Sequence, residues 1–223
     1  MANSVAPAAP VKLVILPRTR AGLSRGGLRQ HLETVHGPMV VNEPEVAGRF
    51  VSYVHHYAQD LTAPKDAAVL HDRDAVTIIR LPGLADLGAS KANAGYHDRI
   101  GPDEDNFRDI DGSVALLAEA QEVAPGADDA PRKLFIFRNA MPRNLDAWAS
   151  TIADIVRDQR LLGAIINSAK PVEGHFPYAQ FDEIGLPLAT DPASVANIVT
   201  MAARAQFGEV DTALILTEPV RFI

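Results

Sequence analysis

Seven histidines and no cysteine limit the chemistry that is open to this chain of 223 residues. Without a thiol there is no thiolate nucleophile, no disulfide, no iron–sulfur cluster and no zinc site with Cys ligands. Histidine can take up and release a proton near neutral pH, and it is also a common metal ligand. The candidate chemistries are therefore acid–base catalysis and metal binding by histidine.

The spacing of the histidines is unfavourable for a metal. His31 and His36 are five positions apart, and at about 100° per residue on an α-helix their side chains would point about 140° apart. His55 and His56 are adjacent on an expected strand and would face opposite sides of a sheet. The sequence has no HExxH motif, no His-x-His pair and no carboxylate triad. We therefore predict no dedicated metal site.

His36 is the strongest candidate for a catalytic acid or base. Gly37 and Pro38 follow it directly and should end or bend the helix at this point. The negative end of the helix dipole would then favour the imidazolium and raise the pKa of His36. The alternative is that His36 only caps the helix and does no chemistry.

An expected strand at residues 50–57 presents two different faces. One face carries Val51, Tyr53, His55 and Tyr57, and the other carries Phe50, Ser52, Val54 and His56. The first set suits the wall of a wet cavity, so we predict catalytic roles for Tyr53 and His55 and a substrate contact for Tyr57. A register shift of one residue would exchange the two sets, so His56 also stays a candidate.

Three further residues complete the predicted substrate-binding set. His31 lies on the same expected helix as His36. Arg18, like Arg138, ends a strand and could receive an anionic substrate; a salt bridge at the rim is the equal alternative. His97 lies in a predicted loop at 96–99, which is either a lid or, more simply, a solvated turn.

Two echoes in the sequence indicate a duplicated unit. KLVILPR at 12–18 is echoed by KLFIFR at 133–138, and the pattern at 113–119 returns at 212–218. Residues 124–130 (APGADDA) have the composition of a linker. We predict a disordered leader at 1–10, a first repeat at 11–123, a linker at 124–131 and a second, degenerate repeat at 132–223.

Each repeat is expected to run strand, helix, strand, strand, helix, strand. In the first repeat we predict strands at 12–17, 50–57, 75–81 and 113–123, a helix capped by Ser24 with Leu28, Leu32, Val35 and Met39 on its apolar side, and a helix at 84–94. In the second we predict helices at 145–162 and 192–205 and strands at 133–138, 176–184 and 212–220. The predicted fold class is α+β, two ferredoxin-like βαββαβ repeats that form a pseudo-dimeric α+β barrel around a shared cavity, or else pack back to back.

The segment LRQHLETVHGP at 28–38 resembles the signature of EthD-domain proteins, and DEDNFRD at 103–109 resembles their acidic segment before the last strand. These landmarks cover most of 11–123, whereas the second half has Arg157 at the position that matches His36. The family is similar to muconolactone isomerases, polyketide cyclases, dehydratases, decarboxylases and quinol-forming monooxygenases, and more distant relatives bind haem. The resemblance implies the scaffold and does not choose a reaction.

Composition and missing motifs narrow the remaining choices. The net charge of −7 disfavours nucleic acid and anionic membranes as partners, and the absence of cysteine fits a cytoplasmic location. No nucleotide-binding glycine motif and no G-x-S-x-G is present. We predict a cofactor-independent acid–base enzyme, a lyase, dehydratase or isomerase, that acts on a small cyclic or aromatic substrate in the barrel cavity. The alternatives are a cofactor-free monooxygenase of a phenol, and a non-catalytic ligand-binding or assembly protein; homodimer formation stays open.

Overall fold

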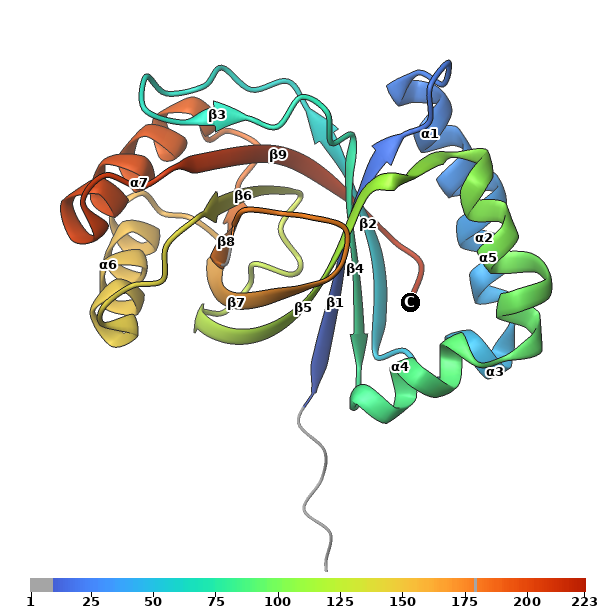
Figure 1. Cartoon of the computed structure of the whole chain (residues 1–223). Coiled ribbons are helices and arrows are strands. Elements are labelled where there is room, and N and C mark those ends of the chain that lie inside the picture. Colours follow the sequence, from blue (N-terminus) through green and yellow to red (C-terminus); the bar gives the residue numbers. More distant parts are fainter. Residues whose placement is uncertain (1–9, 179) are drawn as a thin grey trace, which may run out of the picture.

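The computed structural model describes residues 10–178 and 180–223, and its centre is a closed barrel of eight antiparallel strands (Figure 1). The strand order around the barrel is β2-β4-β1-β5-β7-β8-β6-β9, and β9 pairs with β2 to close it. A short strand, β3 (Ala68–Val69), joins β9 in parallel at the outside. The barrel strands are β1 (Val11–Thr19), β2 (Ser52–Gln59), β4 (Ala75–Leu81), β5 (Arg108–Ala124), β6 (Arg132–Arg138), β7 (Gly163–Glu173), β8 (Gln180–Leu186) and β9 (Thr212–Arg221).

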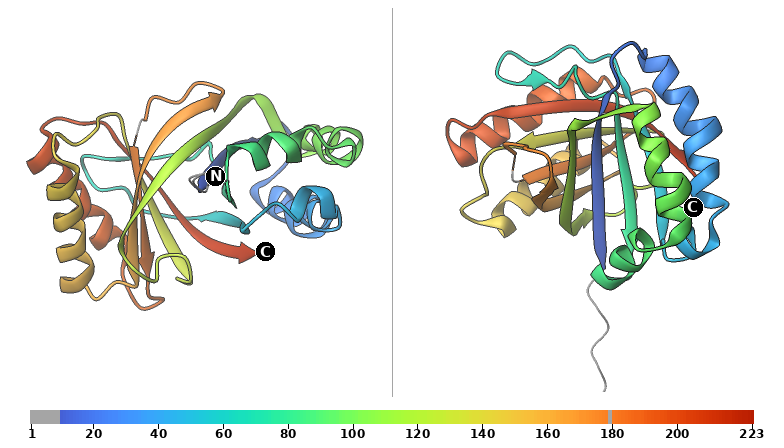
Figure 2. Two further views of the ribbon diagram at one scale, coloured as in Figure 1. Left: turned by 90° about the horizontal axis from the view of Figure 1, so that it is seen from below. Right: turned by 45° about the vertical axis from the view of Figure 1, so that its right-hand side comes forward.

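Helices cover the barrel on two opposite sides (Figures 1 and 2). One side, over β6 to β9, carries α6 (Leu145–Asp158) and α7 (Pro192–Phe207). The other side, over β1, β2, β4 and β5, carries a helical layer made of α1 (Arg25–His31), η1 (Leu32–His36), α2 (Gly37–Val41), α3 (Pro44–Ala47), α4 (Leu84–Lys91), η2 (Tyr96–Ile100), α5 (Gly101–Asp103) and η3 (Glu104–Asn106). None of the described helices combines the length and the apolar composition needed to cross a membrane.

The α+β fold class with a barrel is confirmed. The strands that come first along the chain lie together as β2-β4-β1-β5, and the later ones as β7-β8-β6-β9, so both groups have the same spatial order. The origin of this order in two fused repeats with a linker at 124–131 stays a prediction. The proposed leader at 1–10 lies, apart from Pro10, outside the described residues.

Side chains fill the interior of the barrel. Phe135, Phe137 and Phe181 are fully buried there and contact one another, with ring centroids 5.3 to 6.4 Å apart. Val14 and Leu16 of β1 pack against the same core, because alternate residues of a strand point inward. Over this part of the barrel, side chains occupy the space in which we predicted the shared cavity, and a small pocket beside Val54 and His56 is left at one end.

A charged group also lies inside the barrel, and we call Lys12, Lys133, Glu183 and Asn167 the barrel-interior cluster. The ammonium groups of Lys12 and Lys133 both donate to the carboxylate of Glu183, with an N–O distance of 2.7 Å for Lys133, and Lys12 also donates to Asn167 at 2.9 Å. Burial lowers the pKa of Lys12. Burial acts in the opposite sense on Glu183, but the two ammonium groups outweigh it and hold the pKa of this carboxyl well below its usual value.

Several predicted elements need correction. The strand at 163–173 (β7) was missed, the helix from 145 ends at Asp158 instead of 162, and the strand expected at 176–184 is Gln180–Leu186. The expected loop at 96–99 is helical. Ser24 does cap α1, since its hydroxyl accepts from the N–H of Gly27 at 3.1 Å, but Val35 is 40% exposed and does not belong to the apolar side of the helix.

Candidate active site

The main cavity lies between the helical layer and the outer face of β1, β2, β4 and β5. It encloses about 810 Å³ of space free of protein atoms, counting the part that is open to solvent. Most of its wall is apolar, and the apolar lining includes Leu13, Ile15, Val40, Val46, Phe50, Ile79, Leu87, Ile100 and Ala115. Such a lining suits an apolar ring system, with the few polar side chains of the wall left to orient it.

Two wide helical turns shape the helical layer. In η1 the N–H of Gly37 bonds to the carbonyl of Leu32, five residues back, and in η2 the N–H of Gly101 bonds to the carbonyl of Tyr96 in the same way. A Gly-Pro pair follows each turn. Proline has no N–H to donate, and in an α-helix its ring would meet the carbonyl four residues back. A π-helical turn takes up the extra residue, so the helix continues past the proline instead of ending.

The wide turn at η1 brings His31 and His36 to the same carboxylate. His36 Nδ1 lies 2.9 Å from Asp103 Oδ2, and His31 Nε2 lies 3.0 Å from the same oxygen. Residues five apart stack on one face of a π-helical turn, because its hydrogen bond joins residues i and i+5. The prediction that the two histidines point about 140° apart is therefore wrong. Of the two outcomes predicted at Gly37, an end or a bend, the helix does not end there, since α2 continues to Val41.

Asp103 and His36 form a carboxylate–imidazole pair at the cavity wall. Burial favours the protonated carboxyl of Asp103, but hydrogen bonds from Asn106, His31 and His36 outweigh it and lower the pKa of this group. An ionised carboxylate only accepts, so His36 donates through Nδ1–H and a neutral ring carries its lone pair on Nε2. His36 lines the cavity, and no described residue makes a hydrogen bond with its Nε2 atom.

Burial also lowers the pKa of His36, even though Asp103 acts to raise it. The expectation of a raised pKa from a helix end is wrong, because His36 lies within a continuing helix and is only 7% exposed. The ring of Phe107 packs edge-on against that of His36, with centroids 4.7 Å apart, and fixes its plane. At neutral pH this imidazole is therefore uncharged and able to accept a proton.

A second polar group crosses the floor of the cavity from β2 to β4. The hydroxyl of Tyr53 lies 2.8 Å from His55 Nε2, and His55 Nδ1 lies 2.7 Å from the hydroxyl of Thr77. Burial lowers the pKa of His55 to about 3 and raises that of Tyr53 well above its usual value, so neither group is charged near neutral pH. All three side chains line the cavity.

The third polar group was not predicted as a site. Arg108 contacts the carboxylates of Glu104 and Glu173, the latter at 3.3 Å, and the hydroxyl of Tyr96 donates to Glu104 at 3.1 Å. All four residues line the cavity, and two carboxylates face one guanidinium. The acidic segment at 103–109 was the available signal, but it served only for the family resemblance and its side chains were given no roles.

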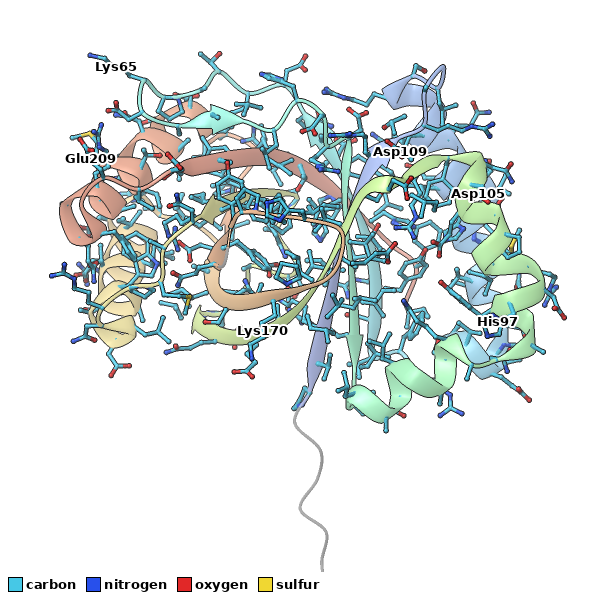
Figure 3. The ribbon with its side chains drawn as sticks, in the orientation of Figure 1. Lys65, His97, Asp105, Asp109, Lys170 and Glu209 are labelled. Atoms are coloured by element: carbon cyan, nitrogen blue, oxygen red, sulfur yellow. The ribbon has the colours of Figure 1, made fainter. Side chains whose placement is uncertain are left out.

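Five predicted substrate-binding residues do not line the main cavity. His31 holds Asp103 from the outer side, and Tyr57 packs beneath α1 with Arg29 over its ring. His56 points into the barrel against Phe135, where it lines a smaller pocket with Arg80, Asp128 and Lys133. Arg18 pairs at the surface with Asp72 and Asp109, and His97 is exposed on the helical layer (Figure 3).

The opposite side of the barrel has a filled core where the first side has a cavity. Trp148 of α6 is fully buried between the helices and the strands, and it donates from its ring N–H to Asp182. Arg138 makes a two-fold ion pair with the same carboxylate, with both N–O distances 2.7 Å. Arg138 is thus a core residue and cannot receive a substrate. Arg157, which matches His36 in the count from the first strand, is solvent-exposed.

Within residues 10–178 and 180–223, no group of three or more histidine, aspartate or glutamate side chains is arranged so that it could hold a metal ion. The polar groups of the cavity wall include the imidazole of His36, the Tyr53–His55 pair and the cluster of Arg108 with two carboxylates. Ser90 and Lys91 of α4 also line the cavity. These groups can accept a proton and donate hydrogen bonds to a bound molecule.

The architecture is that of the dimeric α+β barrel type, and comparisons with known proteins agree with it. Residues 20–111 match the EthD domain, and this range contains every cavity residue of the helical layer. No curated protein sequence matches the chain.

Three solved structures illustrate the likeness. An anthrone oxidase-like protein is 11% identical, with a TM-score of 0.60 over 97% of this chain and 94% of that one. A protein described as a monooxygenase from Fusobacterium nucleatum is 12% identical, with a TM-score of 0.53 over 95% and 93%. A chlorite dismutase variant from Candidatus Nitrospira defluvii is 7% identical, with a TM-score of 0.52 over 95% and 91%. At such identities the likeness concerns the fold alone.

Proposed function

We propose that this chain is an enzyme that removes a proton from a small, uncharged cyclic or aromatic substrate, with His36 as the general base. The observation that carries the proposal is the pair of His36 and Asp103 at an apolar cavity. The carboxylate fixes the tautomer of the ring, so the lone pair of Nε2 is available to the cavity, and it stabilises the imidazolium that forms after proton transfer.

Tyr53 and His55 are proposed to bind the oxygen on which negative charge develops. Thr77 can donate to His55 Nδ1, His55 can donate from Nε2 to the oxygen of Tyr53, and the hydroxyl of Tyr53 is then free to donate to the substrate. A donor held in place in a dry site stabilises an enolate or phenolate without reorganising. In this proposal His55 orients Tyr53 and does not itself carry the proton.

The charges at the acidic end support an uncharged substrate. Glu104 and Glu173 share the single guanidinium of Arg108, and Asp103 adds a further carboxylate behind His36. A carboxylated substrate bound at this end would meet more negative than positive charge, because the other cation of the cavity wall, Lys91, is on α4 and exposed to solvent. Neutral phenols, lactones and polycyclic ketones fit this environment better than muconate-like acids.

Two outcomes can follow proton removal. Return of the proton to another atom gives an isomerase, and loss of a leaving group gives a dehydratase or another lyase. The second candidate is a cofactor-free monooxygenase, in which the substrate supplies all electrons: a ring CH₂ and O₂ give a ring C=O and water. The apolar cavity favours the monooxygenase candidate, as does the fold shared with structures described as a monooxygenase and an anthrone oxidase-like protein.

The test is a turnover screen with anthrone, neutral phenols, lactones and a muconate, under air and under nitrogen. We expect neutral ring substrates to react, and His36→Gln to lower the rate by about 10²- to 10⁴-fold. His97→Gln is the matched control, because this histidine is exposed and does not line the cavity. Oxygen uptake that matches product formation selects the monooxygenase, and turnover under nitrogen selects the lyase or isomerase.

Three results would count against the proposal. Equal rates for His36→Gln and the unaltered protein would remove the base from the mechanism. Tight ligand binding that survives this substitution, with no product, would favour a non-catalytic binding protein. A Soret band in the purified sample would show a haem and contradict the cofactor-independent mechanism.

A homodimer and a cytoplasmic location also remain proposals. The barrel closes within one chain through the pairing of β9 with β2, so a second copy is not needed to complete it. Light scattering of the purified protein will decide the oligomeric state.

A further inference from the structure

The end of β9 reaches across the barrel seam into the candidate site. Phe222 and Ile223 follow this strand and pair with β2 through its backbone: the N–H of Phe222 donates to the carbonyl of Tyr53 at 2.9 Å, and the N–H of Tyr53 donates to the carbonyl of Ile223 at 3.2 Å. Tyr53 of the candidate site is thus held by the end of β9. This strand pairs with β2 on one side and with β6, from the opposite side of the barrel, on the other.

The ring of Phe222 contacts both members of the Tyr53–His55 pair. Its centroid lies 5.5 Å from that of Tyr53 and 5.2 Å from that of His55, edge-on in the latter case. It also lies on the backbone of Gly37, where an added Cβ would be only 2.4 and 2.6 Å from two of the ring carbons. Gly37 directly follows His36, so one aromatic ring touches the Tyr53–His55 pair and the turn that carries the base.

We propose that Phe222 is a positioning residue of this site: it closes the wall behind His55, holds Tyr53 in line and sets the distance between the strand β2 and the helical turn of His36. A glycine at position 37 is then required by the close approach of this ring and of the Leu32 carbonyl, and not by its own backbone conformation, which is helical with φ near −58°. In this proposal the end of β9, the strand that closes the barrel by pairing with β2, also completes the wall of the cavity beneath the helical layer.

The physical effect is the exclusion of water. His55 is 1% exposed, and its charged form is disfavoured chiefly by burial. Removing the ring of Phe222 opens a cavity that borders the imidazole, and water that enters there solvates the charged form. The protonation of His55 therefore reports whether Phe222 closes the wall, and loss of global stability alone does not change it.

The experiment is a histidine titration by ¹⁵N NMR of the full chain, with no substrate present. In the unaltered protein His55 is expected to stay neutral at pH 5, since its pKa is about 3. In Phe222→Ala its midpoint should rise above about pH 5, toward the ordinary value of a solvated histidine. Phe222→Leu, which keeps most of the volume, should leave His55 neutral at pH 5.

The matched control is Phe207→Ala on the opposite side of the barrel. Phe207 packs against Trp148, with centroids 5.0 Å apart, and its removal is also a deletion of a partly buried aromatic ring. It should leave the titration of His55 unchanged. A folded Phe222→Ala protein in which His55 titrates as in the unaltered protein would overturn the proposal, as would an equal change in Phe207→Ala.

A second measurement covers the contact with Gly37. Gly37→Ala also brings the new methyl group to 2.7 Å from the carbonyl of Leu32, and this clash is the same in both backgrounds. The destabilisation by Gly37→Ala should therefore be smaller in the Phe222→Ala protein than in the unaltered one, and the difference reports the ring alone. Strict additivity would overturn the contact. The positioning role rests on the proposed function, but both measurements are made without turnover, so they can fail or succeed independently of it.

Discussion

Asp103→Asn tests the proposed base most directly, because it keeps the size of the side chain and removes its charge. The carboxylate accepts from His36 Nδ1 at 2.9 Å, from His31 Nε2 at 3.0 Å and from Asn106 Nδ2 at 3.0 Å. An amide has only one acceptor oxygen, and its nitrogen donates, so one of the present donors loses its partner. If the amide nitrogen faces His36, the ring must accept at Nδ1 and carry its proton on Nε2, where it can no longer act as a base.

The size of the effect follows from these contacts. A hydrogen bond to a charged group contributes about 1.5–3 kcal/mol, and about 1.4 kcal/mol corresponds to a tenfold change in rate. Loss of the negative charge beside the imidazolium should thus slow the proton transfer about 10- to 150-fold, even where the tautomer is kept. A changed tautomer would add to this, up to the roughly 10⁴-fold loss seen when the carboxylate of a serine-protease triad is replaced by an amide.

Two assays check this prediction. Turnover of a substrate found in the screen gives the rate, and ¹⁵N NMR gives the tautomer of His36 and its pKa, which should fall further because Asp103 acts to raise it. Asp105→Asn is the control: this exposed neighbour, labelled in Figure 3, makes no side-chain hydrogen bond within the described residues. A folded Asp103→Asn protein that turns over within twofold of the unaltered enzyme would refute the reasoning.

Three further predictions concern stability and orientation. Glu183→Gln removes the carboxylate shared by the two ammonium groups of the barrel-interior cluster and leaves Lys133 with Asp128 alone, at 3.4 Å. It should lower the free energy of unfolding by about 3–5 kcal/mol in urea titrations, whereas Asp158→Asn at an exposed pair should cost under about 1 kcal/mol. Tyr53→Phe removes the donor aimed at the substrate oxygen and should lower kcat about 10²-fold or more with little change in KM. Because His55 has a pKa of about 3 when folded and about 6.5 when unfolded, the unfolded chain binds the extra proton between these values. The contribution of His55 to stability should therefore fall by about 1.6 kcal/mol from pH 6.5 to pH 5, and His55→Gln should reduce the pH dependence by this amount, while His36 and His56, whose pKa values burial also lowers, keep their share.

The faces of the strands could be predicted from sequence because alternation is a local property. β4 was predicted with its observed bounds, Ala75–Leu81, and Tyr53 and His55 were assigned to the face that lines the cavity while His56 was assigned to the other. The strand fixes this division whatever surrounds it. What lies against each face depends on the rest of the chain, so local pattern cannot supply it.

The position of the cavity illustrates this limit. Both faces of β1 and β2 are apolar enough to be buried, and a strand buried on both sides gives no sign of which side is filled. The interior is filled because Phe135, Phe137 and Phe181 come from strands that are distant in sequence and meet there. Only the closed topology places three aromatic rings on one side and leaves room beneath the helical layer on the other.

The pairing of His36 with Asp103 depends on a choice that the local sequence leaves open. Proline after a helix residue can end the helix, kink it or widen one turn, and the residues around Pro38 are compatible with each. The wide turn is selected by its partners: a carboxylate 67 positions away that binds both imidazoles, and an aromatic ring from the end of β9 that packs on Gly37. Asp103 itself follows a second wide turn, η2, and its Gly-Pro pair. The base and its carboxylate are therefore both positioned by a π-helical turn. When two histidines lie five residues apart ahead of a Gly-Pro pair, they should therefore be considered both as residues that share one helix face and as residues that point apart.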